Sequence, residues 1–504
     1  MLLLGIDLGT SSVKVSVLDA ATQKCIASVH YPETEVDIIS PQPGWAEQSP
    51  DLWWENVKQA ILKCNATKLY DPADIGAIGI AYQMHGLVLV DKDQHVLKNS
   101  IIWCDSRAVD IGEEAFINIG SEKCLSRLLN SPGNFTASKL AWVKENEPAV
   151  YEKIDKVMLP GDFISMKMTG EITTTVSALS EGIFWDFRDN AVSKDIINYF
   201  GFDLSLFPGI RSLFSAHGHL KETVATRLSL KAGIPVSYKA GDQLNNALSL
   251  NVLRPGEVAA TAGTSGVIYG VSDQLEYDEQ SRINSFAHVN HQADKTRIGV
   301  LLCINGAGIF TRWVKNLVGV NRTYNELNIA AAKIPAGSDG LLALPFGNGA
   351  ERMLNNRSVG AHFKNLDFNI HTDTHLVRAA QEGIAFAFRY GLDIMRENGM
   401  DPTIIRAGKT NLFLSDVFTG SFVNSTQVAV EFYNGDGSFG AALGAGIGAG
   451  IFKDAATAFS NRKAIGIVEP KDHNIHENLY QEWKWFLNEK LDKIKKENEL
   501  TSIA

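Results

Sequence analysis

The chain has 504 residues, of which 45% are hydrophobic and 21% are charged, as in an ordinary globular protein with substantial cores. Its net charge of −10 argues against nucleic acid as a main partner, because binding to phosphate backbones requires clustered cations. The five cysteines are widely spaced and form no CxxC pair, and neither a signal peptide nor a membrane-spanning stretch is recognisable. These features predict a cytoplasmic protein with reduced thiols.

The first predicted elements are two strands, residues 2–6 and 13–17, joined by a tight turn that contains Gly9, Thr10 and Ser11. A helix is expected to begin at Ser49-Pro50, with proline in its first turn. Three further strands are predicted at 75–81, 88–90 and 101–103. Strands that alternate with helices indicate an α/β fold, in which ligands gather where strands end.

The turn of the first half recurs in the second half. Gly9-Thr10-Ser11 reappears as Gly263-Thr264-Ser265, and the following Val17 and Asp19 reappear at the same spacing as Val271 and Asp273. The repeat predicts two related domains, which we place at residues 1–250 and 251–504. Each glycine-threonine turn presents backbone N–H groups and a hydroxyl, as a phosphate site does. An ordinary turn without a ligand is the alternative, but the presence of two matched copies favours phosphate binding.

The second half repeats the strand-to-loop pattern. Strand 300–304 leads into Gly306, and strand 403–406 leads into Ala407-Gly408. A helix of small residues is expected over 438–451. Its glycines at 440, 444 and 448 recur every fourth residue, which indicates close helix packing rather than a dinucleotide motif.

Two carboxylates stand out. Asp7 precedes the first turn, whereas Thr261 stands at the matching place in the second, so a single Mg²⁺ at the first turn would have one such ligand. Asp242 follows the strand predicted at 234–239. It is interpreted either as the N-cap of a helix beginning at Gln243 or as a general base for a substrate hydroxyl.

The residues that follow two other predicted strands are interpreted as a sugar pocket. Met84 and His85 follow strand 75–81, and Trp103 and Asp105 follow the end of strand 101–103. An imidazole and a carboxylate bind hydroxyls, while a thioether and an indole pack on carbon. The alternatives are a core methionine beside a surface histidine, and an ion pair of Asp105 with Arg107 near a buried tryptophan.

Together these segments resemble the FGGY carbohydrate kinases of the actin-like ATPase superfamily, and within them the xylulokinases. The resemblance rests on Gly5–Thr10, Gln83–Gly86, Trp103–Arg107, Gly241–Gln243 and Gly263–Gly266, among other motifs, and extends to about Gly450. It implies two actin-like (ribonuclease H-like) ATPase domains with a ligand cleft between them. The implied reaction is the ATP- and Mg²⁺-dependent phosphorylation of D-xylulose.

The resemblance also implies residue roles. Asp242 matches the catalytic base, Met84 and His85 match a substrate-contacting pair, and Trp103 and Asp105 are assigned to the same pocket. Metal binding is expected from Asp7 and Asp242. Nucleotide binding is expected from the residues Gly9, Thr10, Ser11, Lys14, Gly263, Thr264, Gly306 and Gly408.

Some choices remain open. The substrate is expected to be a pentulose, but ribulose, a hexulose, a polyol or a sugar acid are alternatives, and a nucleotide-binding sensor without transfer activity is a more distant one. Where the family commonly has Gly-Gly-Gly-Ala, this chain reads Ala407-Gly408-Lys409-Thr410, which predicts an altered purine pocket. A homodimer is the ordinary expectation for an enzyme of this kind.

Overall fold

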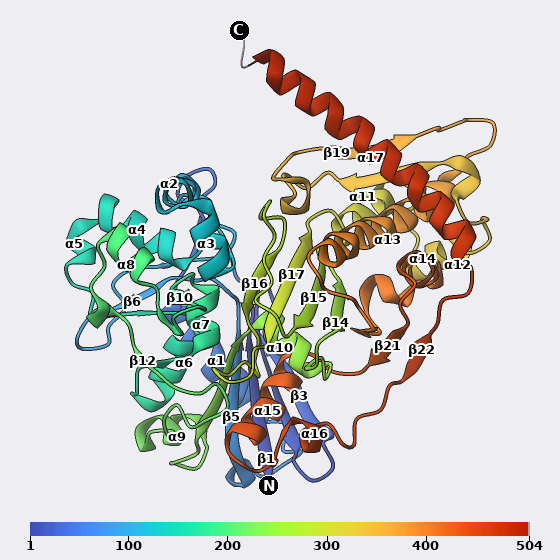
Figure 1. Ribbon diagram of the computed structural model, residues 1–504. Coiled ribbons are helices and arrows are strands. Elements are labelled where there is room, and N and C mark those ends of the chain that lie inside the picture. Colours follow the sequence, from blue (N-terminus) through green and yellow to red (C-terminus); the bar gives the residue numbers. More distant parts are fainter. Residues whose placement is uncertain (502–504) are drawn as a thin grey trace.

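The computed structural model describes residues 1–501 and contains two large mixed sheets with helices packed against them (Figure 1). The first sheet has the order β13-β5-β1-β2-β3 and consists of β1 (Leu2–Leu8), β2 (Val13–Asp19), β3 (Cys25–Tyr31), β5 (Ile75–Tyr82) and β13 (Val236–Gly241). The second has the order β16-β17-β15-β14-β20-β21-β22 and consists of β14 (Glu257–Ala262), β15 (Gly266–Ser272), β16 (Asn284–Ala287), β17 (Ile298–Ile304), β20 (Ile404–Gly408), β21 (Val430–Tyr433) and β22 (Gly466–Val468).

The two sheets share one topology. In the first, β1 pairs antiparallel with β2 and parallel with β5, and β13 continues the parallel side. In the second, β14 pairs antiparallel with β15 and parallel with β20, and β21 continues the parallel side. The strands β16 and β22 are additions at the two edges. The repeated turn therefore marks a repeated domain architecture, as the sequence predicts.

One face of the first sheet is covered by helices of the first half. Val15, Ile6 and Ile78 belong to a core cluster with residues of α1 (Pro50–Asn65) and α6 (Pro160–Thr169). The helix α1 begins as predicted, since the Ser49 hydroxyl accepts a hydrogen bond from the N–H of Leu52.

The other face of the first sheet is covered by α15 (Gly437–Gly448), a helix from the second half of the chain (Figure 1). A methyl group added at Gly444 would overlap the ring of Tyr238, and one at Gly448 would overlap the carbonyl of Ser237. The glycine stripe thus allows close packing, as expected, and the helix ends three residues earlier than the predicted 451.

Three segments carry the chain between the sheets: one after α10 (Asp242–Ser249), one between β21 and α15, and one between α15 and β22, which contains Arg462. Arg462 joins them, because its guanidinium donates hydrogen bonds to the carbonyls of Ser249 and Asn434. Its plane also lies over the ring of Phe439, 4.5 Å from the centroid.

The remaining elements surround the sheets. Those of the first half are α2 (Val109–Ile119), α3 (Ser121–Leu128), α4 (Thr136–Asn146), α5 (Pro148–Tyr151), α7 (Val176–Glu181), α8 (Lys194–Phe200) and α9 (Glu222–Leu228), with the short strands β4 (Glu47–Gln48), β6 (Val88–Val90), β7 (Ser100–Ile101), β8 (Lys156–Met158), β9 (Thr173–Thr174), β10 (Trp185–Asp186), β11 (Ala191–Val192) and β12 (Gly209–Ile210). Those of the second half are α11 (Gly308–Val318), α12 (Tyr324–Ala331), α13 (Asp373–Glu397), α14 (Asp416–Thr426), α16 (Ala455–Ala458) and α17 (His473–Thr501), with β18 (Leu342–Phe346) and β19 (Gly360–Lys364). Among the described residues, no helix combines the length and apolar character needed to cross a membrane.

Candidate active site

Three parallel strands of the first sheet end side by side. In the pairing register, Leu8 of β1 lies opposite Tyr82 of β5, and Tyr82 lies opposite Gly241 of β13. The residues that follow these strands are therefore neighbours, which brings Asp7, the turn at Gly9, the Gln83–His85 segment and Asp242 to one edge. This is the sheet edge at which α/β proteins bind ligands.

Asp7 lies among carboxylates. Burial and the charges of Asp242 and Asp436 raise its pKa to about 7, and Lys14 lowers it by a smaller amount. Asp436 caps α15 by accepting from the N–H of Phe439, and it also forms an ion pair with Lys14. The predicted nucleotide contact Lys14 is therefore engaged by a carboxylate in this structure.

Asp242 is the first residue of α10, and Gly241 occupies the N-cap position without a side-chain capping bond. The helix thus begins one residue earlier than predicted, so Asp242 occupies its first position rather than the N-cap position. Burial raises its pKa to about 6, and hydrogen bonding to Gln243 lowers it in part. At neutral pH it is mostly ionised and retains enough basicity to take a proton from a hydroxyl.

The first glycine-threonine turn is held by polar side chains. The Thr10 hydroxyl donates to Oε1 of Gln83 (3.3 Å) and accepts from the indole N–H of Trp103 (3.0 Å). Gln48 donates to the Thr10 carbonyl (2.7 Å). Trp103 is 53% exposed, so much of its side chain remains open to solvent beside the turn. The structure thus brings Trp103 to the turn at Gly9 and Thr10, while Ser11 lies exposed next to them.

Met84 and His85 lie near the end of β13, which Asp242 follows. The Met84 side chain packs against the α-carbon of Gly241, the residue before Asp242. The His85 ring lies against Phe135 of the first half and Phe286 of β16, with centroids 4.8 and 5.5 Å away. His85 therefore stands where side chains of the two halves meet.

Asp105 is fully buried within an ion-pair network. Its carboxylate accepts from the guanidinium of Arg107 (2.7 Å) and from the N–H of Ala46, and the same guanidinium lies 3.8 Å from the ring centroid of Trp45. The sequence assigns Asp105 to the sugar pocket. In this structure its oxygens are occupied by protein groups, as in the alternative interpretation of an ion pair with Arg107.

The second glycine-threonine turn borders a cavity of about 470 Å³. Gly263 and Thr264 line it, and their carbonyls accept from the N–H groups of Gly308 and Ile309 at the start of α11 (both 3.0 Å). Other lining residues come from α11, α12 and the segment after β20, among them Thr311, Tyr324, Asn325, Asn328, Asn411 and Ser415. A cavity of this size and lining suits a nucleoside.

Gly306 and Gly408 lie beside this cavity rather than in its wall. Gly306 packs against the carbonyl of Pro345, and Gly408 ends β20 next to the loop that carries Asn411. The side chain of Lys409 lies over the ring of Phe432, 4.5 Å from its centroid. The unusual lysine is thus placed against the protein's own aromatic ring.

Several site residues were not found from the sequence. Asp436 has a signal, since Asp before a helix of small residues is an N-cap pattern, but nothing in the pattern places it beside Asp7. Tyr324 follows the capping box Thr323–Glu326, which predicts a helix but not its position at a cavity. Lys139, which donates to the His85 carbonyl, has no recognisable signal at all.

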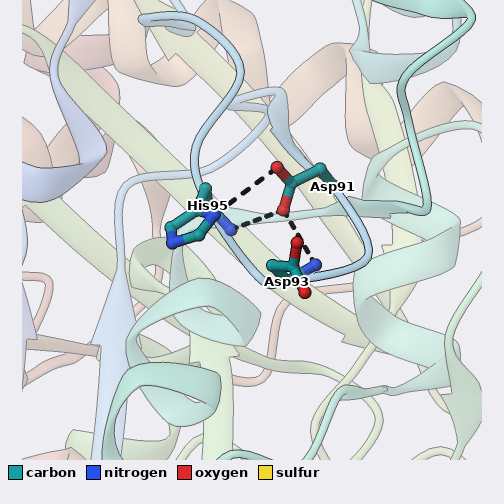
Figure 2. Close-up of side chains that lie close together, drawn as sticks. All are labelled: Asp91, Asp93 and His95. Carbon is teal, nitrogen blue, oxygen red and sulfur yellow. Dashed lines mark hydrogen bonds and ion pairs between the residues drawn. The ribbon is translucent and has the colours of Figure 1, made fainter.

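A separate group of acidic and histidine side chains lies on an exposed turn after β6 (Figure 2). Oδ1 of Asp91 accepts from the N–H groups of Asp93 and His95, both at 2.9 Å. These bonds define an Asx-type turn and explain the clustering without a ligand.

Comparisons with known proteins agree with this arrangement. Residues 2–249 match the N-terminal domain of the FGGY family of carbohydrate kinases. A xylulose kinase from Bacillus subtilis (strain 168) is 30% identical over 463 residues, which cover 89% of each chain. The crystal structure of a xylulose kinase from Rhodospirillum rubrum matches with a TM-score of 0.86 at 26% identity, over 96% of this chain and 98% of that one.

A gluconate kinase from Lactobacillus acidophilus shares the fold, with a TM-score of 0.87 at 22% identity over 97% of this chain and 98% of that one. The expected fold of two actin-like domains is thereby confirmed. The extent of the match to the Bacillus protein identifies the reaction class as phosphoryl transfer from ATP to a carbohydrate. The chain belongs to the FGGY family of carbohydrate kinases.

Proposed function

We propose that the protein is a xylulose kinase that transfers the γ-phosphoryl group of ATP to a primary hydroxyl of D-xylulose. The observation that carries the proposal is the position of Asp242. Asp242 directly follows β13, the Met84 side chain packs against the preceding Gly241, and burial raises the pKa of the Asp242 carboxyl to about 6. Similarity to xylulose kinases over most of the chain supports the choice of sugar.

In the proposed reaction, Asp242 accepts the proton of the sugar hydroxyl as its oxygen attacks the γ-phosphorus. Met84, His85 and Trp103 orient the sugar, and Asp105 supports the pocket through Arg107. The N–H groups of the two turns, at Gly9–Ser11 and Gly263–Thr264, bind the phosphates, and the cavity beside the second turn takes the nucleoside. Exclusion of water by closure of the two halves would prevent hydrolysis of ATP.

The carboxylate cluster fits a magnesium ion. The charges of Asp242 and Asp436 raise the pKa of Asp7, and a divalent cation would relieve that repulsion. Asp7 and Asp242 are the proposed ligands. Bound there, Mg²⁺ would neutralise charge on the transferred phosphoryl group.

A sugar acid is the second candidate for the substrate. Arg352 forms no ion pair with the described residues, and its guanidinium lies 5.9 Å from the centroid of Phe135, the ring that packs on His85. Burial lowers the pKa of Arg352, as expected of a cation without an anionic partner. A substrate carboxylate is one group that could pair with it.

A panel of D-xylulose, D-ribulose, D-fructose, xylitol, glycerol and D-gluconate, assayed by ADP release, tests the proposal. We expect the highest kcat/KM with D-xylulose. A higher kcat/KM for another compound of the panel would make that compound the proposed substrate. ATP binding without phosphoryl transfer to any compound would favour a nucleotide-binding sensor. A cytoplasmic location and a homodimer remain predictions, and the second is checked by mass measurement in solution.

A further inference from the structure

His85 is fixed by the protein at three points. Its backbone has φ of 61°, a left-handed conformation that a non-glycine residue rarely adopts without support. The backbone N–H points to Oε1 of Glu181 (3.4 Å), and Nδ1 lies 3.0 Å from the Glu181 carbonyl oxygen. The His85 carbonyl accepts from Nζ of Lys139 (3.0 Å). The ring is therefore held in one orientation before any substrate binds.

These contacts determine where the ring carries its proton. A carbonyl oxygen can only accept, so the Nδ1 of His85 must be the donor in its bond to Glu181. Burial, together with the nearby charges of Lys139 and Arg352, lowers the pKa of His85 to about 3, so the ring is neutral. A neutral imidazole with hydrogen on Nδ1 carries a lone pair on Nε2.

Nε2 of His85 is the polar atom of the ring that remains available. It makes no hydrogen bond within residues 1–501, and it is not among the buried polar atoms that lack a partner. Solvent therefore reaches Nε2, although the ring itself packs against Phe135 and Phe286. A ligand at this position meets an acceptor and not a donor.

Lys139 connects this histidine to the other substrate loop. Its side chain is fully buried on α4, and Nζ donates both to the His85 carbonyl and to the Ile102 carbonyl, each at 3.0 Å. Ile102 directly precedes Trp103. The ammonium forms no direct ion pair with any residue that the structure describes; burial lowers its pKa to about 7, although the nearby charge of Asp105 raises it in part. A buried cation without an ionic partner is costly, so its retention needs a reason.

We propose that Lys139 is a positioning residue that holds the Met84–His85 turn against the Ile102–Trp103 segment. In this position, Nε2 of His85 accepts a hydrogen bond from a substrate hydroxyl. It therefore disfavours a carboxylate or any other group that can only accept. The inference rests on the proposed sugar-kinase function and deepens it. It selects hydroxyl-bearing ketoses or polyols over sugar acids at this contact, because two opposed lone pairs repel.

Fluorinated sugars test the direction of this bond. Fluorine can accept weakly but cannot donate. Deoxy and deoxyfluoro analogues of D-xylulose at carbons 1, 3 and 4 therefore distinguish a substrate hydroxyl that donates to His85 from one that accepts from it. We expect one position at which both analogues lose roughly tenfold or more in kcat/KM. In His85→Asn, whose side chain also donates and tolerates the left-handed backbone, this loss should shrink. Fluoro analogues that retain activity at every position would overturn the inference.

Lysine variants test the positioning role. Lys139→Met should raise the KM for D-xylulose roughly tenfold or more while leaving the KM for ATP within about twofold. Lys144→Met is the matched control, because Lys144 lies on the same helix and also donates to two carbonyls, of Phe200 and Gly201. Melting temperatures separate misfolding from a kinetic effect. Equal changes in both KM values, or the same sugar KM in both variants, would contradict the role of Lys139.

Failure of the proposed function gives a different result. If the unaltered enzyme phosphorylates another ketose or polyol, only the choice of sugar is wrong, and the same deoxy and deoxyfluoro pairs are then made on that sugar. If D-gluconate is preferred and the preference disappears in His85→Asn, His85 binds a carboxylate and the inference is overturned.

Discussion

Asp7 and Asp242 lie at the ends of two strands that flank β5, and the charge of Asp242 raises the pKa of Asp7. The negative charge of Asp242 therefore makes the Asp7 carboxyl harder to ionise. Asp7 precedes the repeated turn, and Asp242 lies in the segment between its two copies, so this interaction links the proposed base to the proposed metal ligand.

Removal of the base should separate transfer from binding. We expect Asp242→Asn to lower kcat by roughly 10²–10⁴-fold, because proton transfer contributes about that much, while ATP binding changes little. The measurement is steady-state ADP release together with calorimetric titration of ATP. Asp105→Asn is a useful comparison, since it should destabilise the fold through Arg107. Retained turnover in Asp242→Asn would disprove the base.

The pH profile should show the ionisation of Asp242. Its pKa in the folded protein is raised from 3.8 to about 6, so the carboxylate that acts as base is lost below that value. We expect kcat/KM for the sugar to fall on the acid side with an apparent pKa near 6. An acid limb near 4 would show instead that the carboxyl has an ordinary environment.

The contribution of Asp7 to the free energy of unfolding should decrease as pH rises, whereas kcat/KM should increase. A carboxyl whose folded pKa exceeds its unfolded value binds more protons when folded, so its ionisation lowers stability as pH rises from about 4 to 7. We expect Asp7→Asn to raise the melting temperature relative to the wild type at pH 8, with little difference at pH 3.5. A uniform shift at both pH values would point to packing rather than charge.

Magnesium should compete with protons at Asp7. Because this carboxyl has a pKa of about 7, we expect Mg²⁺ to bind more weakly as pH falls through 7 and to release protons on binding. Titration of Mg²⁺ in two buffers of different ionisation enthalpy measures the released protons. An affinity that stays constant between pH 6 and 8 would exclude Asp7 as a ligand.

The aromatic wall of the cavity should affect the nucleotide alone. Tyr324 is 47% exposed and lines the cavity beside Gly263 and Thr264. We expect Tyr324→Ala to raise the KM for ATP about fivefold or more, from the loss of a stacking surface, with the sugar KM unchanged. Tyr199→Ala, on α8, is the control for loss of a partly exposed tyrosine. An equal effect of both substitutions would remove Tyr324 from the nucleotide site.

The sequence predicts the fold well where local patterns repeat. Gly9-Thr10 and Gly263-Thr264 mark matching hairpins, and Asp242 lies at the strand end that the pattern indicates. It fails where a role depends on distant partners. Lys139 is an unremarkable helical lysine until folding places it against the carbonyls of residues 54 and 37 positions away. The sequence assigns Asp105 to the sugar pocket because a mixture of aromatic, acidic and basic residues suits a polyol. It does not reveal that Arg107 and the N–H of Ala46 already occupy its carboxylate.

The position of α15 has a consequence for synthesis on the ribosome. The face of the first sheet that carries Leu3, Ala77 and Tyr238 is covered by a helix that begins at Gly437, about 200 residues after that sheet's last strand ends. At roughly 5–20 residues per second, the face stays uncovered for about 10–40 s after its strands have emerged. The nascent first half is therefore a natural client for chaperones, and a transcript truncated near residue 250 should yield an aggregating product.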